Sequence, residues 1–302
     1  MRSVLTSERL NLFRKIRKEA GAWLLLLPSL LLFAIFVWHP LISGLVLSFF
    51  ETKGFDIIKF NGLQNYVDVV SDSAFKTTLA NTAFYTLWSL VIGFLVPVTV
   101  AVIINEMVHL NAFFRFSVYF PAMVPGVVTA IMWNFMLDPG EQGLFNTLLA
   151  FFGLSPSVWL LNPRMTIPLI VATMTWRGFG STAIIYLASL QGVNHELYEA
   201  STLDGAGVWA RLRYVTFPHL SNILNLMLIM QIIGVFQVMY EPLTMTEGGP
   251  NNASASLMLQ SYFYGFRYFQ AGRSMAVGAI TFMILVPLII FYFRANGKKD
   301  AD

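Results

Sequence analysis

The chain of 302 residues has no cysteine and little charge. Without thiols it can form no disulfide, bind no zinc through cysteine and use no thiol nucleophile. Lys, Arg, Asp and Glu together make up 12% of the residues, whereas soluble domains carry roughly 25%. A folded soluble protein of this length is therefore not expected, because too few charges are available to cover its surface.

Catalytic signatures are missing as well. The sequence has neither a G-x-x-x-x-G-K-[ST] phosphate-binding loop nor a G-x-S-x-G nucleophile turn. Its four histidines are scattered, and none form a pair at i, i+4 spacing, so no metal site is predicted. We find no catalytic pair at one membrane depth either. We expect the chain to be no enzyme and to hold no metal or cofactor of its own.

Hydrophobic residues, by contrast, are abundant. They make up 56% of the chain, aromatic residues make up 15%, and the mean hydropathy is +0.65. A helix needs about 20 apolar residues to cross the hydrocarbon core of a bilayer. We therefore predict an all-α, multi-pass protein of the lipid bilayer with six transmembrane helices. These lie near Trp23–Phe50, Ala83–Ile104, Ser117–Leu137, Met165–Leu187, Ile223–Tyr240 and Met275–Phe293.

The distribution of Lys and Arg predicts the orientation. With the N-terminus inside, the inner segments hold twelve of these residues and the outer segments hold six. By the positive-inside rule both termini are expected to be cytoplasmic. Six basic residues crowd the first 18, directly before an apolar run, which is typical of a membrane anchor and not of a nucleic-acid-binding face. We divide the chain into a basic segment 1–22, a transmembrane domain 23–293 and a tail 294–302.

Two longer segments lie between the predicted spans. The outer one, residues 51–79, is predicted to be an ordered loop with a helical end. The inner one, residues 188–222, contains Asn194, a preferred N-cap residue, and Gly205, which tolerates the positive φ of a tight turn. It therefore predicts two short helices joined by a turn. They are either a plain connection on the membrane surface or, because Trp209 and other apolar residues stand at the tip, a surface for a partner.

The inner segment also carries a motif. Glu199-Ala200-Ser201, then Gly205, then Val215-Thr216-Phe217-Pro218 follow without a gap the spacing E-A-A, three residues, G, nine residues, I-x-L-P. The chain thus resembles the permease subunits of binding-protein-dependent ABC importers. Asn61-Gly62-Leu63-Gln64-Asn65-Tyr66 and Thr246-Glu247-Gly248-Gly249-Pro250 narrow the resemblance. They are similar to the first permease subunit of the maltose/lactose/glycerol-3-phosphate branch of carbohydrate importers.

The resemblance implies a division of labour among subunits. A second homologous permease, two ABC ATPase subunits that hold ATP and Mg, and an extracytoplasmic solute-binding protein are the expected partners, in the bacterial cytoplasmic (inner) membrane. Contact with the binding protein is expected at Gly248, Gly249 and Pro250. The residues expected to couple to the ATPase are Glu199, Ala200, Ser201, Leu203, Asp204, Gly205, Ala206 and Val208.

Polar groups inside the spans indicate a substrate pathway. An Arg near a helix centre costs about 2.5–3.5 kcal/mol on the insertion scale, so Arg177 is expected either to pair with a neighbouring helix or to line a cavity. Gln237 and Glu241 are predicted to share a helical face, being four residues apart. Amides beside aromatic rings suit polyols, and alignment with the maltose-type relatives adds small residues. The predicted pathway comprises Trp176, Arg177, Gly178, Ser181, Gln231, Gly234, Val235, Gln237 and Tyr240.

The function that the resemblance implies is import of a sugar or oligosaccharide by alternating access, driven by ATP hydrolysis on partner subunits. Two alternatives remain open. The first keeps the family but changes the cargo to glycerol-3-phosphate or an anionic oligosaccharide, with Arg177 as the counter-charge. The second is an ion-coupled secondary transporter, which the absence of visible repeats and of several intramembrane acids disfavours.

Overall fold

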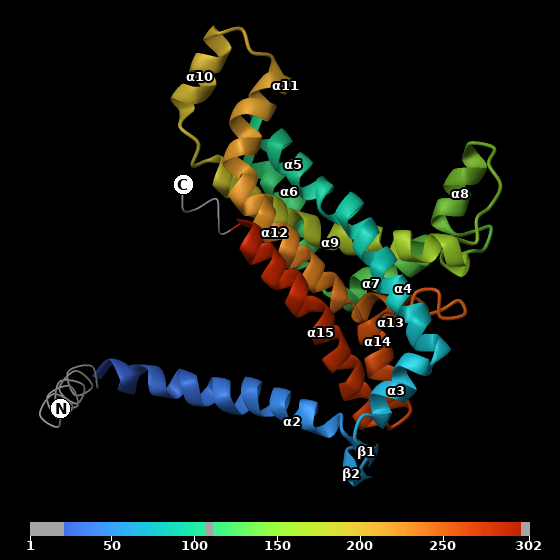
Figure 1. The fold of residues 1–302 in the computed structure, drawn as a ribbon. Helices are drawn as coiled ribbons and strands as arrows, with labels where there is room; N and C mark the ends of the chain where they lie inside the picture. The colour runs from blue at the N-terminus through green and yellow to red at the C-terminus, as the bar shows by residue number, and fades with distance from the viewer. Residues whose placement is uncertain (1–20, 107–110, 297–302) are drawn as a thin grey trace, which may run out of the picture.

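The computed structural model describes residues 21–106 and 111–296. In this part of the chain most of the long helices form an elongated bundle, from which the N-terminal helix Gly21–Leu47 extends away (Figure 1). A pair of short helices projects from one end of the bundle and a small β-hairpin lies toward the other. Most of the basic segment 1–22 and of the tail 294–302 lies outside the described residues.

The described part is mostly helical. The N-terminal helix, Gly21–Leu47, includes the π-helical turn η1 (Ala34–Trp38) and α2 (His39–Leu47). The next elements are β1 (Phe50–Lys53), β2 (Asp56–Phe60), α3 (Gln64–Ser71), α4 (Ser73–Trp88), η2 (Ser89–Gly93), α5 (Leu95–Glu106), α6 (Asn111–Met123), α7 (Gly126–Met136) and α8 (Leu144–Phe151). The remainder are η3 (Trp159–Leu161), α9 (Pro163–Leu190), α10 (His195–Leu203), α11 (Val208–Arg211), η4 (Leu212–Thr216), α12 (Phe217–Phe236), α13 (Tyr240–Thr246), α14 (Leu257–Tyr262), η5 (Phe263–Arg267) and α15 (Ala271–Asn296).

Within the described residues, four helices are long and apolar enough to cross a membrane. They are Gly21–Leu47, Ser73–Glu106, Val208–Phe236 and Ala271–Arg294, and the bent pair α6 and α7 makes a fifth if it counts as one span. The long helix α9 is not among them. It packs against α4, α5, α6, α7 and α12, so much of its surface meets other helices instead of lipid and can carry polar residues.

The apolar stretch predicted as a span over Ser117–Leu137 is not one continuous helix, because α6 and α7 meet at 94°. Helix α6 ends at Met123 and α7 begins at Gly126. Pro125 lies in the break, with an extended backbone (φ −56°, ψ 138°). A proline disfavours helical geometry in the residue before it and has no N–H for the helical hydrogen-bond ladder, which explains why the helix stops here.

Two other differences from the predicted spans concern where helices begin and end. Helix α12 ends at Phe236, short of the predicted end at Tyr240, which instead begins α13. Gln237 and Glu241 therefore do not share a helical face, and that prediction is wrong. The second span begins at Ser73 instead of Ala83, because the outer segment contributes its own helical turns.

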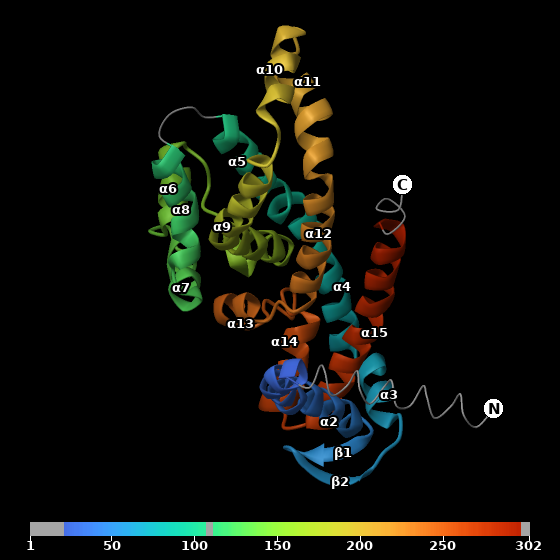
Figure 2. The same cartoon turned by 90° about the vertical axis from the view of Figure 1, so that its left-hand side faces the viewer.

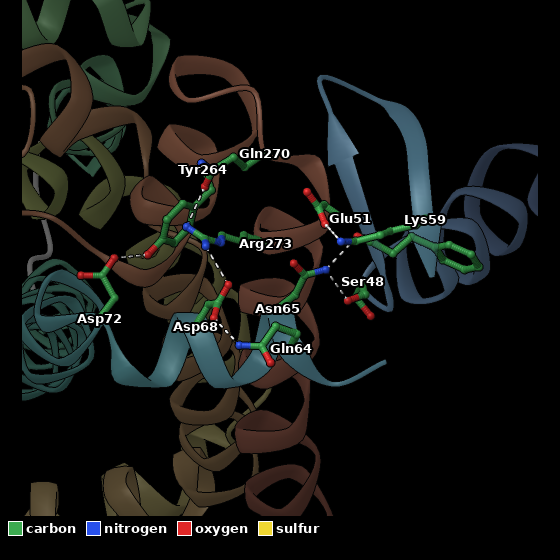
Figure 3. A network of polar contacts seen from close by, with 11 residues as sticks. Ser48, Glu51, Lys59, Gln64, Asn65, Asp68, Asp72, Tyr264, Gln270 and Arg273 are labelled. Carbon is green, nitrogen blue, oxygen red and sulfur yellow. Dashed lines mark hydrogen bonds and ion pairs between the residues drawn. The ribbon is translucent and has the colours of Figure 1, made fainter. Parts of the chain in front are cut away.

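The outer segment is not simply a loop with a helical end. Strands β1 and β2 pair antiparallel, so the fold is not strictly all-α, and α3 follows them. Asn65 on α3 holds the hairpin to the bundle: its Nδ2 donates to the carbonyl oxygens of Ser48 at 2.9 Å and Phe50 at 2.8 Å. Figure 3 shows this network between the hairpin, α3 and the start of α15.

An ion pair ties α3 to α15 within the same network. Arg273 Nη2 lies 2.7 Å from Asp68 Oδ2 (Figure 3). A hydrogen bond from Gln64 and the Arg273 guanidinium hold the pKa of Asp68 below its usual value, against the opposing effect of partial burial. Burial, followed by the hydrogen bond that its hydroxyl donates to Asp72, raises the pKa of Tyr264 to about 12. This end of the molecule is therefore fixed by several polar contacts.

The long helices pack through a core around α9. Ile170 on α9, Tyr85 on α4 and Val235 on α12 are buried in one cluster. Farther along α9, Gly180 lets α6 approach closely, since a Cβ at this position would lie 1.9 Å from the carbonyl oxygen of Val118. Figure 2 shows α9 between α6 and α7 on one side and α12 on the other. These contacts fix the walls of the cavity described below.

Candidate functional site

The projecting pair of helices carries the coupling residues predicted from the sequence. Helix α10 begins where expected, because the side chain of Asn194 accepts a hydrogen bond from the Glu196 N–H at 3.0 Å. Gly205 has φ +75°, the left-handed conformation that glycine adopts without a steric penalty. The N–H of Ala206 then donates to the Ser201 carbonyl at 2.9 Å and closes the turn. The local sequence thus folds as predicted.

The tip of this pair exposes apolar side chains. Leu203 is 89% exposed and Trp209 74% exposed, and Val208 beside them is also exposed. Glu199 on α10 is exposed as well. All eight predicted coupling residues lie on α10, on α11 or in the turn between them. Large apolar side chains at the end of an extension are typical of a surface that a partner covers.

A cavity of about 240 Å³ lies between the η2–α5 segment, α9 and α12. Its polar groups are hydroxyls and one amide, and no charged side chain lines it. Such a lining offers hydrogen bonds without net charge, which suits a neutral, hydroxyl-rich ligand. The lining residues are Ser89, Gly93, Pro97, Met174, Thr175, Gly178, Phe179, Thr182, Met230, Gln231, Gly234 and Val235.

Four of the nine predicted pathway residues line this cavity, namely Gly178, Gln231, Gly234 and Val235. Gln231 lies directly against Gly93: a Cβ at position 93 would stand 2.7 Å from the Gln231 Nε2. The absence of a side chain at this glycine therefore makes room for the amide.

Sequence reasoning missed the cavity wall formed by η2 and α5 and part of the wall formed by α9. Thr175, Gly178 and Thr182 stand at i, i+3 and i+7 on α9, a spacing that places them on one helical face. This row of small and polar residues along an otherwise apolar helix is the signal from which Thr175 and Thr182 could have been predicted. Ser89 and Gly93 carry no comparable signal, because their place in the cavity depends on how α4 and α5 pack against α9.

The remaining predicted pathway residues lie elsewhere. Ser181 and Gln237 are exposed and do not line the cavity. Arg177 Nη1 lies 3.9 Å from Glu241 Oε1, so this arginine has an acidic neighbour from α13. Tyr240 lies close by, since a Cβ at Gly126 would approach both Tyr240 and Arg177, at 3.1 Å and 3.5 Å.

Trp176, the residue before Arg177, belongs to an aromatic pair. Its ring meets that of Trp133 edge to face, with centroids 6.1 Å apart. Trp133 is on α7, which begins at the break after Met123, so the pair depends on the bend between α6 and α7. The structure thus places four of the predicted pathway residues around the uncharged cavity and the other five outside it.

The Gly-Gly-Pro turn is held firmly to the bundle. Gly248 adopts φ +83° and its N–H donates to the Pro242 carbonyl at 3.0 Å. The Ser254 hydroxyl donates to the Gly249 carbonyl at 2.8 Å. From α4, the Tyr85 hydroxyl donates to the Ser254 carbonyl at 2.9 Å. The Gly-Gly-Pro segment is therefore a turn fixed by several hydrogen bonds, whereas its contact with a binding protein stays a prediction.

Comparison with known proteins identifies the family. The family described as "Binding-protein-dependent transport system inner membrane component" matches residues 93–297, more than half of the chain. The match includes the coupling residues and nearly all of the cavity lining. The chain belongs to this family, and the membership expected from the spacing of Glu199, Gly205 and Pro218 is confirmed.

Characterised relatives cover nearly the whole chain. It is 29% identical over 287 residues to the arabinooligosaccharides transport system permease protein AraP of Bacillus subtilis (strain 168), covering 94% of this chain and 91% of the relative. It is 29% identical to the lactose transport system permease protein LacF of Rhizobium radiobacter, covering 93% and 96%. In fold it resembles a bacterial alginate ABC transporter solved in complex with an alginate pentasaccharide-bound periplasmic protein. That likeness has a TM-score of 0.83 and 24% identity and covers 94% and 96% of the two chains.

Proposed function

We propose that this chain is a permease subunit of an ATP-driven importer for neutral sugars or oligosaccharides, in the bacterial cytoplasmic membrane. The observation that carries the proposal is the uncharged, hydrogen-bonding cavity between α5, α9 and α12. The same chain presents an exposed apolar tip at Leu203 and Trp209. Both relatives named above are permeases whose names specify sugars.

The complete transporter would contain a second homologous permease, two ATPase subunits that bind ATP and Mg, and a solute-binding protein. In this arrangement α9 supplies a further span, so that six cross the membrane and both termini are cytoplasmic. The tip at Leu203 and Trp209 would dock in a groove of an ATPase subunit. Closure of the ATPases would then move α10 and α11 and turn the cavity outward to receive sugar.

A neutral cargo is favoured over an anionic one. Arg177, the counter-charge that an anionic substrate would need, has Glu241 at 3.9 Å and does not line the cavity. A substrate carboxylate or phosphate would have to compete with Glu241 for this arginine, whereas sugar hydroxyls can bond to Thr175, Thr182 and Gln231 without disturbing it.

Uptake into proteoliposomes tests the proposal. The chain is co-purified with its partner subunits, and ATP is sealed inside the vesicles. The external panel is radiolabelled lactose, maltose, trehalose, arabinotriose and, as anions, glycerol-3-phosphate and an alginate trisaccharide, each with the binding protein. We expect ATP-dependent uptake of at least one neutral sugar and of neither anion. Uptake that is indifferent to ATP, or confined to an anion, contradicts the proposal.

A matched pair of variants tests the cavity itself. Gln231→Ala removes the amide, and one hydrogen bond contributes about 0.5–1.5 kcal/mol. We therefore expect the KM for uptake to rise between about twofold and tenfold. Ser181→Ala, an exposed α9 position that does not line the cavity, should leave KM unchanged. If both variants have the same KM, Gln231 does not bind the substrate and serves only in packing.

A further inference from the structure

The cavity walls differ in how they connect to the coupling tip. Helix α9 leads into α10 through residues 191–194, and α12 continues directly from α11 and η4 within one long helix, Val208–Phe236. The third wall, η2 and α5, has no such direct connection. A movement of the tip therefore reaches α9 and α12 through the backbone, but reaches α5 only through contacts between side chains.

One ion pair joins the coupling tip to α5 directly, in addition to the packing of α5 against α9. Arg211, at the end of α11, places Nη2 3.4 Å from Glu106 Oε2 on α5. The Nη1 of the same guanidinium donates to Thr202 Oγ1 on α10 at 3.4 Å. Arg211 thus holds both short helices of the projecting pair and the third cavity wall together.

The ion pair is partly shielded from solvent. Glu106 is the last described residue of α5, and its side chain is 37% exposed. The Arg211 guanidinium offsets the charge of this carboxylate. Arg211 is partly buried, with a side chain that is 23% exposed. It lines a cavity of about 280 Å³ with Asn105, Gln191 and Tyr198.

Helix α5 is rigid between this contact and the substrate cavity. Val98, Ala101 and Ile104 are buried in one cluster with Ala183 and Leu187 of α9. Pro97 lines the substrate cavity and lies nine residues from Glu106, a distance of roughly 14 Å along a helix. A displacement of Glu106 is therefore passed to the cavity wall, because the intervening helix is packed along its length.

We infer that Arg211 is a positioning residue which, through Glu106, transmits movement of the ATPase-coupling tip to the α5 wall of the substrate cavity. This inference rests on the proposed function. It adds a route by which the α5 wall, which has no direct backbone connection to the tip, moves together with α9 and α12. Arg211 acts here through Glu106 and touches neither substrate nor nucleotide.

Charge reversal tests the pairing. Arg211→Glu and Glu106→Arg each place like charges in contact, and we expect each to lower sugar uptake and sugar-stimulated ATP hydrolysis of the assembled transporter at least fivefold. The double variant E106R/R211E restores opposite charges and should recover at least half of the wild-type rate. The matched control is Arg213→Glu, which makes the same charge change two residues away. Its guanidinium lies over the Tyr214 ring, 5.7 Å from the centroid, and it should change the rate less than twofold.

The experiment separates failure of the proposed function from failure of the Arg211–Glu106 pairing. If the wild-type transporter shows no ATP-dependent uptake, the proposed function fails. If it transports sugar but the double variant is no better than either single variant, the pairing is contradicted. The fraction of chain that co-purifies with its partner subunits shows whether any variant fails to assemble.

A cross-link removes dependence on folding of the charge variants. The sequence has no cysteine, so Glu106→Cys with Arg211→Cys gives a single reactive pair. The cysteine pair lacks the ion pair, so we expect reduced uptake before cross-linking. Joining the two thiols with a short bismaleimide after assembly should then raise uptake at least twofold toward the wild-type rate, because the two ends move together again. Loss of uptake on cross-linking would show that the contact must open during transport, and would overturn the inference.

Discussion

The glycines of α9 give a quantitative test of how closely the helices pack. A Cβ added at Gly180 would lie 1.9 Å from the Val118 carbonyl oxygen and 3.1 Å from the Tyr119 Cα. An ordinary contact needs about 3.5 Å, so α6 would have to move by roughly 1.5 Å. Overpacking of this kind costs about 1–3 kcal/mol. The obstacle is backbone, which cannot rotate aside, and we therefore expect Gly180→Ala to lower the free energy of unfolding by about 1–2 kcal/mol.

Gly178 provides the matched control on the same helix. A Cβ there meets nothing within 4 Å, so Gly178→Ala should only gain the helix propensity of alanine over glycine, about 0.5–1 kcal/mol. That gain is common to both variants and cancels in the comparison. The expected difference between them is about 1–3 kcal/mol. Reversible unfolding of the purified chain in SDS mixed micelles, followed by tryptophan fluorescence, measures it; equal stability would refute the close approach of α6 and α9.

Two further changes act outside the bundle core. Gly205→Ala forces a Cβ into φ +75° at about 1–2 kcal/mol. It should uncouple ATP hydrolysis from uptake, while Gly207→Ala, at φ −69°, should not; matching uptake-to-ATP ratios would contradict this. Asp68→Asn removes the ion pair with Arg273, worth about 0.2–1 kcal/mol at a partly exposed site. Because the pKa of Asp68 is lowered in the folded state from an ordinary 3.8, this contribution is present above about pH 4 and is lost as the pH falls through the lowered pKa. The difference in unfolding free energy between wild type and variant should therefore be present at pH 7 and absent at pH 2, and a pH-independent difference would count against the pair.

Features set by short stretches of sequence were predictable. The start of α10 follows from Asn194, whose side chain bonds to an N–H two residues away. The turn after it follows from Gly205, because one residue decides whether positive φ is tolerated. Pro125 carried a signal for the break between α6 and α7 that the hydropathy of Ser117–Leu137 outweighed in our prediction. The effect of one proline on the backbone therefore decided the structure here, and the mean hydropathy of the stretch did not.

Features that join distant segments were not predictable from one sequence. The sequence predicted that Arg177 either pairs with a neighbouring helix or lines a cavity. It did not decide between the two, because the position of Glu241 depends on where α12 ends and α13 begins. The place of Gly93 beside Gln231 depends on the packing of α5, α9 and α12. The contact between Glu106 and Arg211 likewise joins residues 105 positions apart.

The sequence by itself determined that this chain belongs in a bilayer, where the family motif around Glu199 and Gly205 lies and how that motif turns, because hydropathy, capping and glycine conformation act over a few residues. Only the tertiary structure decided which polar residues share a cavity and which charges meet. Those pairings depend on how whole helices cross, and a helix crossing is decided by side chains on both partners at once.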